Sequence, residues 1–213
     1  MQAVSWVIYG CLWLLFNALG RLFFRYRAVG REPIPKKGGI LVAANHASFL
    51  DIPLLGCGIP RRVWFLGRHD LFPIPGLNAL LRWLGWIPIR PDRFDRTGFR
   101  KAIRLIREGK AVVIFPEGSR TRDGRLHRGK PGIGVIVAET ECQVLPAHIA
   151  GTYEALPMGS RWIRFHPVRV TFGKPIDFSA DRQRHTGKEF YRHVSRAVMA
   201  RIAELGQVAP PAD

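Results

Sequence analysis

The sequence predicts an α/β domain with a mostly parallel central sheet flanked by helices, and an N-terminal membrane-anchoring hydrophobic segment ahead of it. From residue 38 onward, short apolar runs alternate with helix-like stretches, the pattern of a sheet with helical crossovers. The first 20 residues carry no charged side chain. A length of 213 residues fits one domain. We therefore assign residues 1–27 to the anchor, 28–208 to the domain and 209–213 to a flexible tail.

The N-terminal segment is just long enough to cross a bilayer, which takes about 20 mostly apolar residues. A signal peptide would carry its basic residues before the apolar run, whereas here they follow it, at Arg21, Arg25 and Arg27. Three arrangements are open: a spanning helix, a buried core helix, or two shorter pieces within one leaflet, broken at Gly10, Asn17 and Gly20. In both membrane arrangements the arginines place the domain on the cytoplasmic side.

Strands and helices are expected to alternate along the domain. The apolar runs predict strands at residues 39–44, 62–66, 111–115, 144–149 and 168–172. One-sided apolar patterns and stop signals predict helices at residues 100–108, 131–140 and 189–205. The Leu- and Trp-rich residues 71–86 either dip into the bilayer or form a helix packed on the sheet. Because such sheets hold their sites beyond the carboxyl ends of the strands, the residues after Ala44 and Phe115 are the first candidates.

The chain is strongly basic, with 33 Lys and Arg against 16 Asp and Glu, a formal net charge of +17. This balance favours a polyanionic partner, which can be nucleic acid, an anionic bilayer or a phosphorylated substrate. The three cysteines are scattered and odd in number, so they indicate neither a disulfide framework nor a metal site.

The strand at 39–44 leads directly into Asn45-His46-Ala47-Ser48-Phe49-Leu50-Asp51. Histidine is the usual base for taking a proton from an alcohol near neutral pH, and a carboxylate on its far ring nitrogen fixes the tautomer. Because no enzyme nucleophile is evident, the attacking oxygen would belong to the substrate. The same residues fit a capping box, with Ser48 as N-cap and Asp51 closing the turn. The two interpretations are compatible.

The strand at 111–115 leads into a second motif, Phe115-Pro116-Glu117-Gly118-Ser119-Arg120. Gly118 permits close approach of a ligand. Glu117 can accept hydrogen bonds from a polyol, and Arg120 offers a planar fork suited to phosphate. The basic stretch that follows, residues 121–130, ends at Lys130 and suits a loop over an anionic ligand. An ordinary solvated loop between a strand and a helix is the alternative.

With both motifs in one chain and in this order, the sequence resembles the glycerophospholipid acyltransferases, specifically the bacterial-type 1-acyl-sn-glycerol-3-phosphate (lysophosphatidic acid) acyltransferases. The resemblance covers roughly residues 25–180. The family's NHxSxxD motif matches Asn45, His46, Ser48 and Asp51, and its FPEGxR motif matches residues 115–120. The resemblance implies that His46 is the general base and Asp51 its orienting carboxylate. It further implies a substrate site that includes Asn45, Ser48, Glu117, Gly118, Ser119, Arg120 and Lys130, with Arg120 on the phosphate.

Two further family motifs match less closely. The family's proline in a hydrophobic strand corresponds to Pro146, a further substrate-site candidate. Its glycine-to-arginine motif corresponds to GWIPIRPDR, in which Arg90 stands one place early and Pro91 fills the usual slot. Arg93 therefore competes with Arg90 for a phosphate contact. Arg68 stands where the family often has a phosphate-binding lysine.

The implied activity is transfer of a fatty acyl group from acyl-CoA or acyl-ACP, the acyl carrier protein thioester, to the sn-2 hydroxyl of 1-acyl-glycerol-3-phosphate. The product would be phosphatidic acid, made in phospholipid biosynthesis at a bacterial inner (cytoplasmic) membrane. Residues 28–208 would be the acyltransferase domain, using no metal and no enzyme-bound cofactor. Backbone N–H groups near Gly118 are candidates for stabilising the oxyanion. The expected partners are the lysophospholipid acceptor, the thioester donor and an anionic membrane.

Other functions remain open at this point. The acceptor can instead be another lyso-lipid, an aminolipid or glycerol phosphate, because the base and pocket chemistry would be shared. A non-enzymatic binder of nucleic acid or anionic lipid would suit the charge. However, no nucleic-acid motif is present and the apolar N-terminus fits a membrane better. A catalytically dead family member is not indicated, since His46 and Asp51 are both present.

Overall fold

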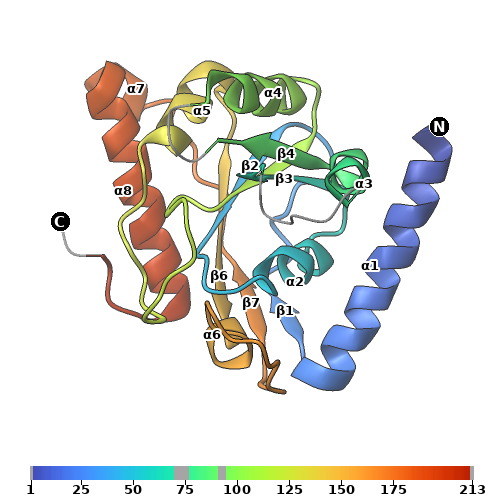
Figure 1. Ribbon diagram of the computed structural model, residues 1–213. Coiled ribbons are helices and arrows are strands. Elements are labelled where there is room, and N and C mark those ends of the chain that lie inside the picture. Colours follow the sequence, from blue (N-terminus) through green and yellow to red (C-terminus); the bar gives the residue numbers. More distant parts are fainter. Residues whose placement is uncertain (1, 70–76, 91–94, 212–213) are drawn as a thin grey trace.

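The computed structural model describes residues 2–69, 77–90 and 95–211. A seven-stranded sheet forms the centre of the molecule (Figure 1). Its strands are β1 (Arg27–Val29), β2 (Ile40–Ala44), β3 (Val63–Arg68), β4 (Trp86–Ile89), β5 (Ala111–Ile114), β6 (Val144–Ala150) and β7 (Arg169–Phe172). They lie in the order β1-β7-β6-β2-β5-β3-β4, and only β6 and β7 pair antiparallel. The predicted mostly parallel α/β fold is confirmed.

The helices are α1 (Gln2–Phe24), α2 (Asp51–Gly58), α3 (Leu77–Leu84), α4 (Arg96–Arg107), α5 (Gly132–Thr140), α6 (Thr152–Ala155), α7 (Asp181–Arg184) and α8 (Gly187–Gly206). All five predicted strands and the three predicted helices of the domain are present, with small shifts in their bounds. Strands β1 and β4 were not predicted. They are short and form the two edges of the sheet, where burial imposes less apolar pattern on a sequence.

Central strands are buried on both faces, which explains their uniformly apolar sequences. Every residue of β2 is buried. Ile40, Val42 and Ala44 belong to the core beneath α2, whereas Leu41 and Ala43 belong to the core beneath α4, α5 and α8. The alternation therefore comes from the strand's two-residue period, and it places two helical layers on one sheet.

Helix α1 runs along one side of the domain, far from α8 on the other side (Figure 1). It is one continuous helix, so the structure contradicts the arrangement of two shorter pieces broken at Gly10, Asn17 and Gly20, one of the three that the sequence left open. Glycine weakens a helix by about 1 kcal/mol without ending it, and at Gly20 a Cβ would stand 3.1 Å from the Leu54 side chain of α2. Its residues Val4–Phe24 are long and apolar enough to cross a membrane, yet only 17% of that window is buried, so α1 is not a core helix.

The sheet register brings the two sequence motifs together. Strands β2 and β5 are parallel neighbours, with Ala43 opposite Ile114. Strand β6 lies on the other side of β2, with Ala147 opposite Ala44. The segments that follow β2 and β5 therefore leave the same edge of the sheet side by side.

Candidate active site

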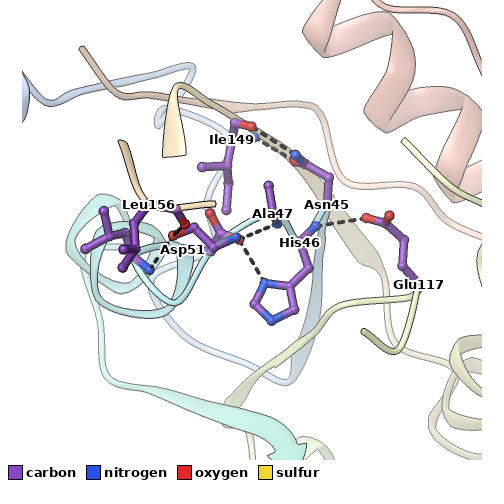
Figure 2. Close-up of polar contacts among 9 residues, drawn as sticks. Asn45, His46, Ala47, Asp51, Glu117, Ile149 and Leu156 are labelled. Carbon is purple, nitrogen blue, oxygen red and sulfur yellow. Dashed lines mark hydrogen bonds and ion pairs between the residues drawn. The ribbon is translucent and has the colours of Figure 1, made fainter. Parts of the chain in front are cut away.

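The two motifs are joined through the backbone of His46. Its N–H donates to Glu117 Oε1 at 2.9 Å, and its carbonyl accepts from the Thr121 N–H at 2.8 Å. The imidazole ring stacks on the Phe115 ring, with centroids 4.0 Å apart and planes at 12°. His46 is thus fixed in position and orientation by the segment that follows β5 (Figure 2).

Asp51 orients the imidazole. Its Oδ2 lies 2.8 Å from His46 Nδ1, and the same oxygen accepts the N–H groups of Ala47 and Ser48 at 2.7 and 2.8 Å. The Asp51 side chain is fully buried, and its Oδ1 has no hydrogen-bond partner among the described residues. Because a carboxylate is the acceptor, Nδ1 carries the proton. Nε2, on the opposite side of the ring from Asp51 (Figure 2), is then left as the basic nitrogen.

The capping interpretation is only half right. Helix α2 begins at Asp51 with Leu50 in the N-cap position and no side-chain cap, so Ser48 is not the N-cap. The Asp51 carboxylate does bind the Ser48 N–H, as the acidic residue of a capping box would. Ser48 Oγ instead accepts the Leu50 N–H at 3.2 Å and donates to the Leu156 carbonyl at 2.8 Å.

His46 lines a cavity of about 660 Å³ that is rich in positive charge. Of the candidates from the sequence, this cavity collects His46, Arg68, Arg90, Gly118, Ser119, Arg120 and Lys130. The Arg120 guanidinium lies 3.6 Å from the centroid of the Phe49 ring, which holds it beside the loop of the first motif. Four cationic side chains around one histidine suit a substrate that carries a phosphate.

Gly118 lets one of these cations approach closely. It has φ +76°, and a Cβ added there would lie 2.9 Å from both Cε and Nζ of Lys130. A larger residue would be strained by the backbone angle and would displace the ammonium group. The Gly118 N–H donates to the Phe115 carbonyl at 3.0 Å. The Ser119 and Arg120 amides, in contrast, donate to no backbone carbonyl in the described part of the chain.

Like Asp51, four of the substrate-site candidates do not line this cavity, and they instead hold the backbone around it. Asn45 Nδ2 donates to the Ile149 carbonyl at 2.9 Å, and its Oδ1 accepts the Ile149 N–H at 2.7 Å. Ser48 binds Leu156 as described above, and Pro146 lies within β6, paired with Ala43. Glu117 bridges two N–H groups, those of His46 and His127, at 2.9 and 3.2 Å. Their binding roles stay predictions, and their contacts in the structure are with protein backbone.

Burial changes the acidity of Glu117. The side chain is 6% exposed, and desolvation raises its pKa to about 7, against the opposing effect of the two N–H bonds that it accepts. Glu117 therefore titrates near neutral pH, and its carboxyl group is hydrogen-bonded to the backbone of the catalytic candidate His46.

A second cavity, of about 340 Å³, adjoins the first. It is bounded by α1, α2, β3 and α3, and three side chains, Phe49, Ile52 and Trp86, line both cavities. The sequence pointed to Trp86 only as part of the Leu- and Trp-rich residues 71–86, of which Leu77–Leu84 form α3 and residues 71–76 lie outside the described part of the chain. Phe49 and Ile52 were not singled out, because apolar side chains near a motif carry no distinguishing signal. Only the folded chain brings the three side chains together, since Trp86 comes from β4, the edge strand that was not predicted.

Comparison with known proteins decides the family. The sequence pattern of the family described as Acyltransferase matches residues 25–150, more than half of the chain. The chain belongs to the acyltransferase family. Both sequence motifs, residues 45–51 and 115–120, lie within the matched range, as does every cavity-lining candidate from the sequence.

Several relatives of this chain are named 1-acyl-sn-glycerol-3-phosphate acyltransferase. It is 33% identical to the chloroplastic 1-acyl-sn-glycerol-3-phosphate acyltransferase LPAT1 of Arabidopsis thaliana, over 72% of this chain and 44% of that protein. It is 26% identical to the 1-acyl-sn-glycerol-3-phosphate acyltransferase of Bacillus subtilis, over 84% of this chain and 87% of that protein. The chain thus spans about half the length of the plant relatives it matches and most of the bacterial one.

The fold of this chain is also found in a solved structure. The 1-acyl-sn-glycerophosphate (LPA) acyltransferase PlsC from Thermotoga maritima superposes with a TM-score of 0.77 at 29% identity, over 96% of this chain and 82% of that one.

The motif around Arg90 departs further from the family pattern than the motifs around His46 and Glu117. Arg90 lines the charged cavity although it stands one place early, and its backbone N–H donates to Asp95, the N-cap residue of α4, at 2.9 Å. Pro91 and the competing Arg93 lie outside the described residues. Trp86 to Ile89 form β4, so the motif is a strand followed by the start of a loop, and Arg90 projects where that strand ends.

Proposed function

We propose that this protein transfers a fatty acyl group from a thioester, acyl-CoA or acyl-ACP, to the sn-2 hydroxyl of 1-acyl-glycerol-3-phosphate, producing phosphatidic acid. One observation carries the proposal: a histidine held by a buried carboxylate shares a cavity with Arg68, Arg90, Arg120 and Lys130. The hydroxyl to be acylated and the phosphate lie on one glycerol unit, so base and cations are needed together. The names of the relatives support this acceptor.

The transfer would use His46 twice. Nε2 takes the proton of the acceptor hydroxyl while the oxygen attacks the thioester carbonyl carbon, and Asp51 stabilises the imidazolium. The tetrahedral intermediate expels the thiolate as the C–S bond breaks, and the imidazolium returns its proton to sulfur. The Ser119 and Arg120 amides are the candidates for stabilising the oxyanion, since the Gly118 amide already donates to Phe115. Side chains and backbone suffice for these steps.

The apolar cavity suits the acyl chain. Its lining consists mainly of aromatic and aliphatic side chains from α1, α2, β3 and α3, and it shares Phe49, Ile52 and Trp86 with the charged cavity. We further propose that the protein lies at a bacterial inner membrane with α1 in contact with lipid. The arginines that follow the apolar run, Arg21, Arg25 and Arg27, favour a domain on the cytoplasmic side. The exposed face of α1 carries Val4, Val7, Leu14, Leu15 and Leu22, as a lipid-facing helix would.

Thiol release from an acyl thioester tests the proposal. Purified protein is assayed with and without lysophosphatidic acid, as wild type and as His46→Ala. Release that requires the acceptor and falls by about 10²-fold or more in the variant supports the assignment. Release without acceptor would indicate a thioesterase. A panel of acceptors that includes glycerol 3-phosphate and neutral lyso-lipids tests the acceptor, and parallel assays with acyl-CoA and acyl-ACP identify the donor.

A further inference from the structure

Between α6 and β7, residues 157–167 expose an unusual amount of apolar surface. Trp162, Ile163 and Phe165 are 81%, 53% and 71% exposed. Soluble surfaces rarely keep large apolar groups together unless the patch binds something. The 157–167 loop is not part of either sequence motif, and Trp162, Ile163 and Phe165 line neither cavity.

The loop holds these side chains in a defined arrangement. Its first half is turned by Ser160, whose Oγ accepts the Trp162 N–H at 3.2 Å and donates to the Trp162 carbonyl at 2.9 Å. Its second half is tied by the Arg164 N–H, which donates to the Ala155 carbonyl at 2.8 Å. The apolar groups are therefore presented by hydrogen-bonded backbone, at little further cost in conformational entropy on binding.

The loop is continuous with the apolar face of α1. The Phe165 ring stacks on Phe23 with centroids 5.0 Å apart, and the Val168 N–H donates to the Phe24 carbonyl at 2.8 Å. Next to Phe23, Leu22 is 72% exposed. Figure 1 shows the segment after α6 beside the C-terminal end of α1. One apolar surface thus runs from the helix onto the loop.

The charge pattern selects the partner. Exposed Arg161 and Arg164 alternate with the apolar residues, and no acidic residue occurs between Glu154 and Asp177. Aromatic side chains interleaved with arginine suit the headgroup region of a bilayer, where the rings sit at the interface and the guanidinium groups meet phosphates.

We propose that the 157–167 loop is a second lipid contact, which inserts Trp162, Ile163 and Phe165 into the interface of an anionic bilayer beside α1. The proposal rests on the proposed function, because it gives the loop a role in loading a lipid acceptor. Met158, from the same loop, lines the charged cavity, and the Leu156 carbonyl is bound by Ser48 of the first motif. The loop therefore connects the lipid surface to the mouth of the site.

Fluorescence of Trp162 tests the contact directly. The full chain is reconstituted in vesicles of phosphatidylcholine and phosphatidylglycerol, and the emission of Trp162→Phe is subtracted from that of wild type. We expect the difference emission to be quenched by lipids brominated near the headgroup and to be protected from aqueous iodide. Unchanged emission in brominated vesicles would overturn the proposal. Protection from iodide without quenching by lipid would also overturn it, by indicating a protein partner.

Matched variants distinguish a specific effect of the 157–167 loop from a general effect of positive charge. Arg161→Gln/Arg164→Gln should reduce the quenching of Trp162, whereas Arg192→Gln/Arg196→Gln, with the same loss of charge on α8, should not. Trp162→Ser/Ile163→Ser should raise KM for an acceptor in vesicles by about five-fold or more, and leave KM for a water-soluble short-chain acceptor unchanged. An equal rise for both acceptors would contradict the lipid role. If no lyso-lipid is acylated, the proposed function fails, while the quenching result still decides the contact.

Discussion

Glu117 Oε1 lies 2.9 Å from the backbone nitrogen of His46, so the acidic residue of the second motif accepts a hydrogen bond from the catalytic candidate of the first. Its other oxygen accepts the His127 N–H at 3.2 Å. The carboxylate thereby links three segments beside the site: the end of β2, the end of β5 and the basic loop that follows β5. Because Glu117 does not line the charged cavity, we expect it to affect the reaction by positioning His46 rather than by contacting the substrate.

Replacing Glu117 should therefore lower kcat more than it changes KM for the acceptor. In Glu117→Ala both N–H groups lose their acceptor, and a small displacement of His46 is enough to reduce the rate by about 10- to 100-fold. Steady-state kinetics measure the split. A rise in KM for the acceptor at unchanged kcat would instead indicate that Glu117 binds the glycerol directly.

Glu117 should also make stability depend on pH. Its pKa is raised from 4.5 to about 7 in the folded protein, so the folded state binds more protons than the unfolded state between these values. Stability then falls as pH rises from about 4.5 to 7, by up to about 3 kcal/mol, and levels off above pH 7. Thermal unfolding across this range should show a steeper fall in wild type than in Glu117→Gln. Parallel profiles would contradict the assignment.

Asp51→Asn should reduce kcat strongly while leaving substrate binding almost unchanged. An asparagine amide no longer requires the proton of His46 to be on Nδ1. If the NH₂ group takes the place of Oδ2, it also faces the N–H groups of Ala47 and Ser48, which it cannot accept. The expected loss is about 10²- to 10⁴-fold. Ser48→Ala is the control from the same motif, since it removes only the bonds to Leu50 and Leu156. It should lower the free energy of unfolding by about 1 kcal/mol.

Among the four cavity cations, Arg120 should contribute most to acceptor binding. It is half-buried, whereas Arg68, Arg90 and Lys130 are exposed, and a phosphate contact in a less solvated position is stronger. Arg120→Ala should raise KM for a phosphorylated acceptor by about 10-fold or more and leave KM for the acyl donor near its wild-type value. Equal effects on donor and acceptor would argue against a phosphate role.

Gly56 should set the length of the acyl chain. It lines the apolar cavity, and a Cβ there would meet the Phe65 and Val63 side chains only at 3.6 Å or more. Gly56→Ala therefore fits the helix but fills part of the cavity, and we expect a shift toward shorter acyl donors at similar total activity. Competition between thioesters of different length measures it. An unchanged preference would place the acyl chain elsewhere.

Local sequence determined much of the fold and the pairing of His46 with Asp51. The short, uniformly apolar runs that form β2 and β5 favoured strands buried on both faces, and the motif residues follow their carboxyl ends, where parallel sheets hold their sites. His46 and Asp51 are five residues apart, so a turn entering a helix suffices to pair them. Their partnership needed no knowledge of distant contacts.

The rest was decided by tertiary structure, because it depends on which distant segments the sheet order makes neighbours. That Glu117 and Asn45 bind backbone, at His46 and at Ile149, follows from the positions of β5 and β6 on either side of β2. The edge strand β4 brings Trp86 and Arg90 to the cavities. The stacking of Phe165 on Phe23 joins residues far apart in the chain. Sequence periodicity reports which residues are buried, whereas the partner of each buried or exposed group is set only when the strands are ordered in space.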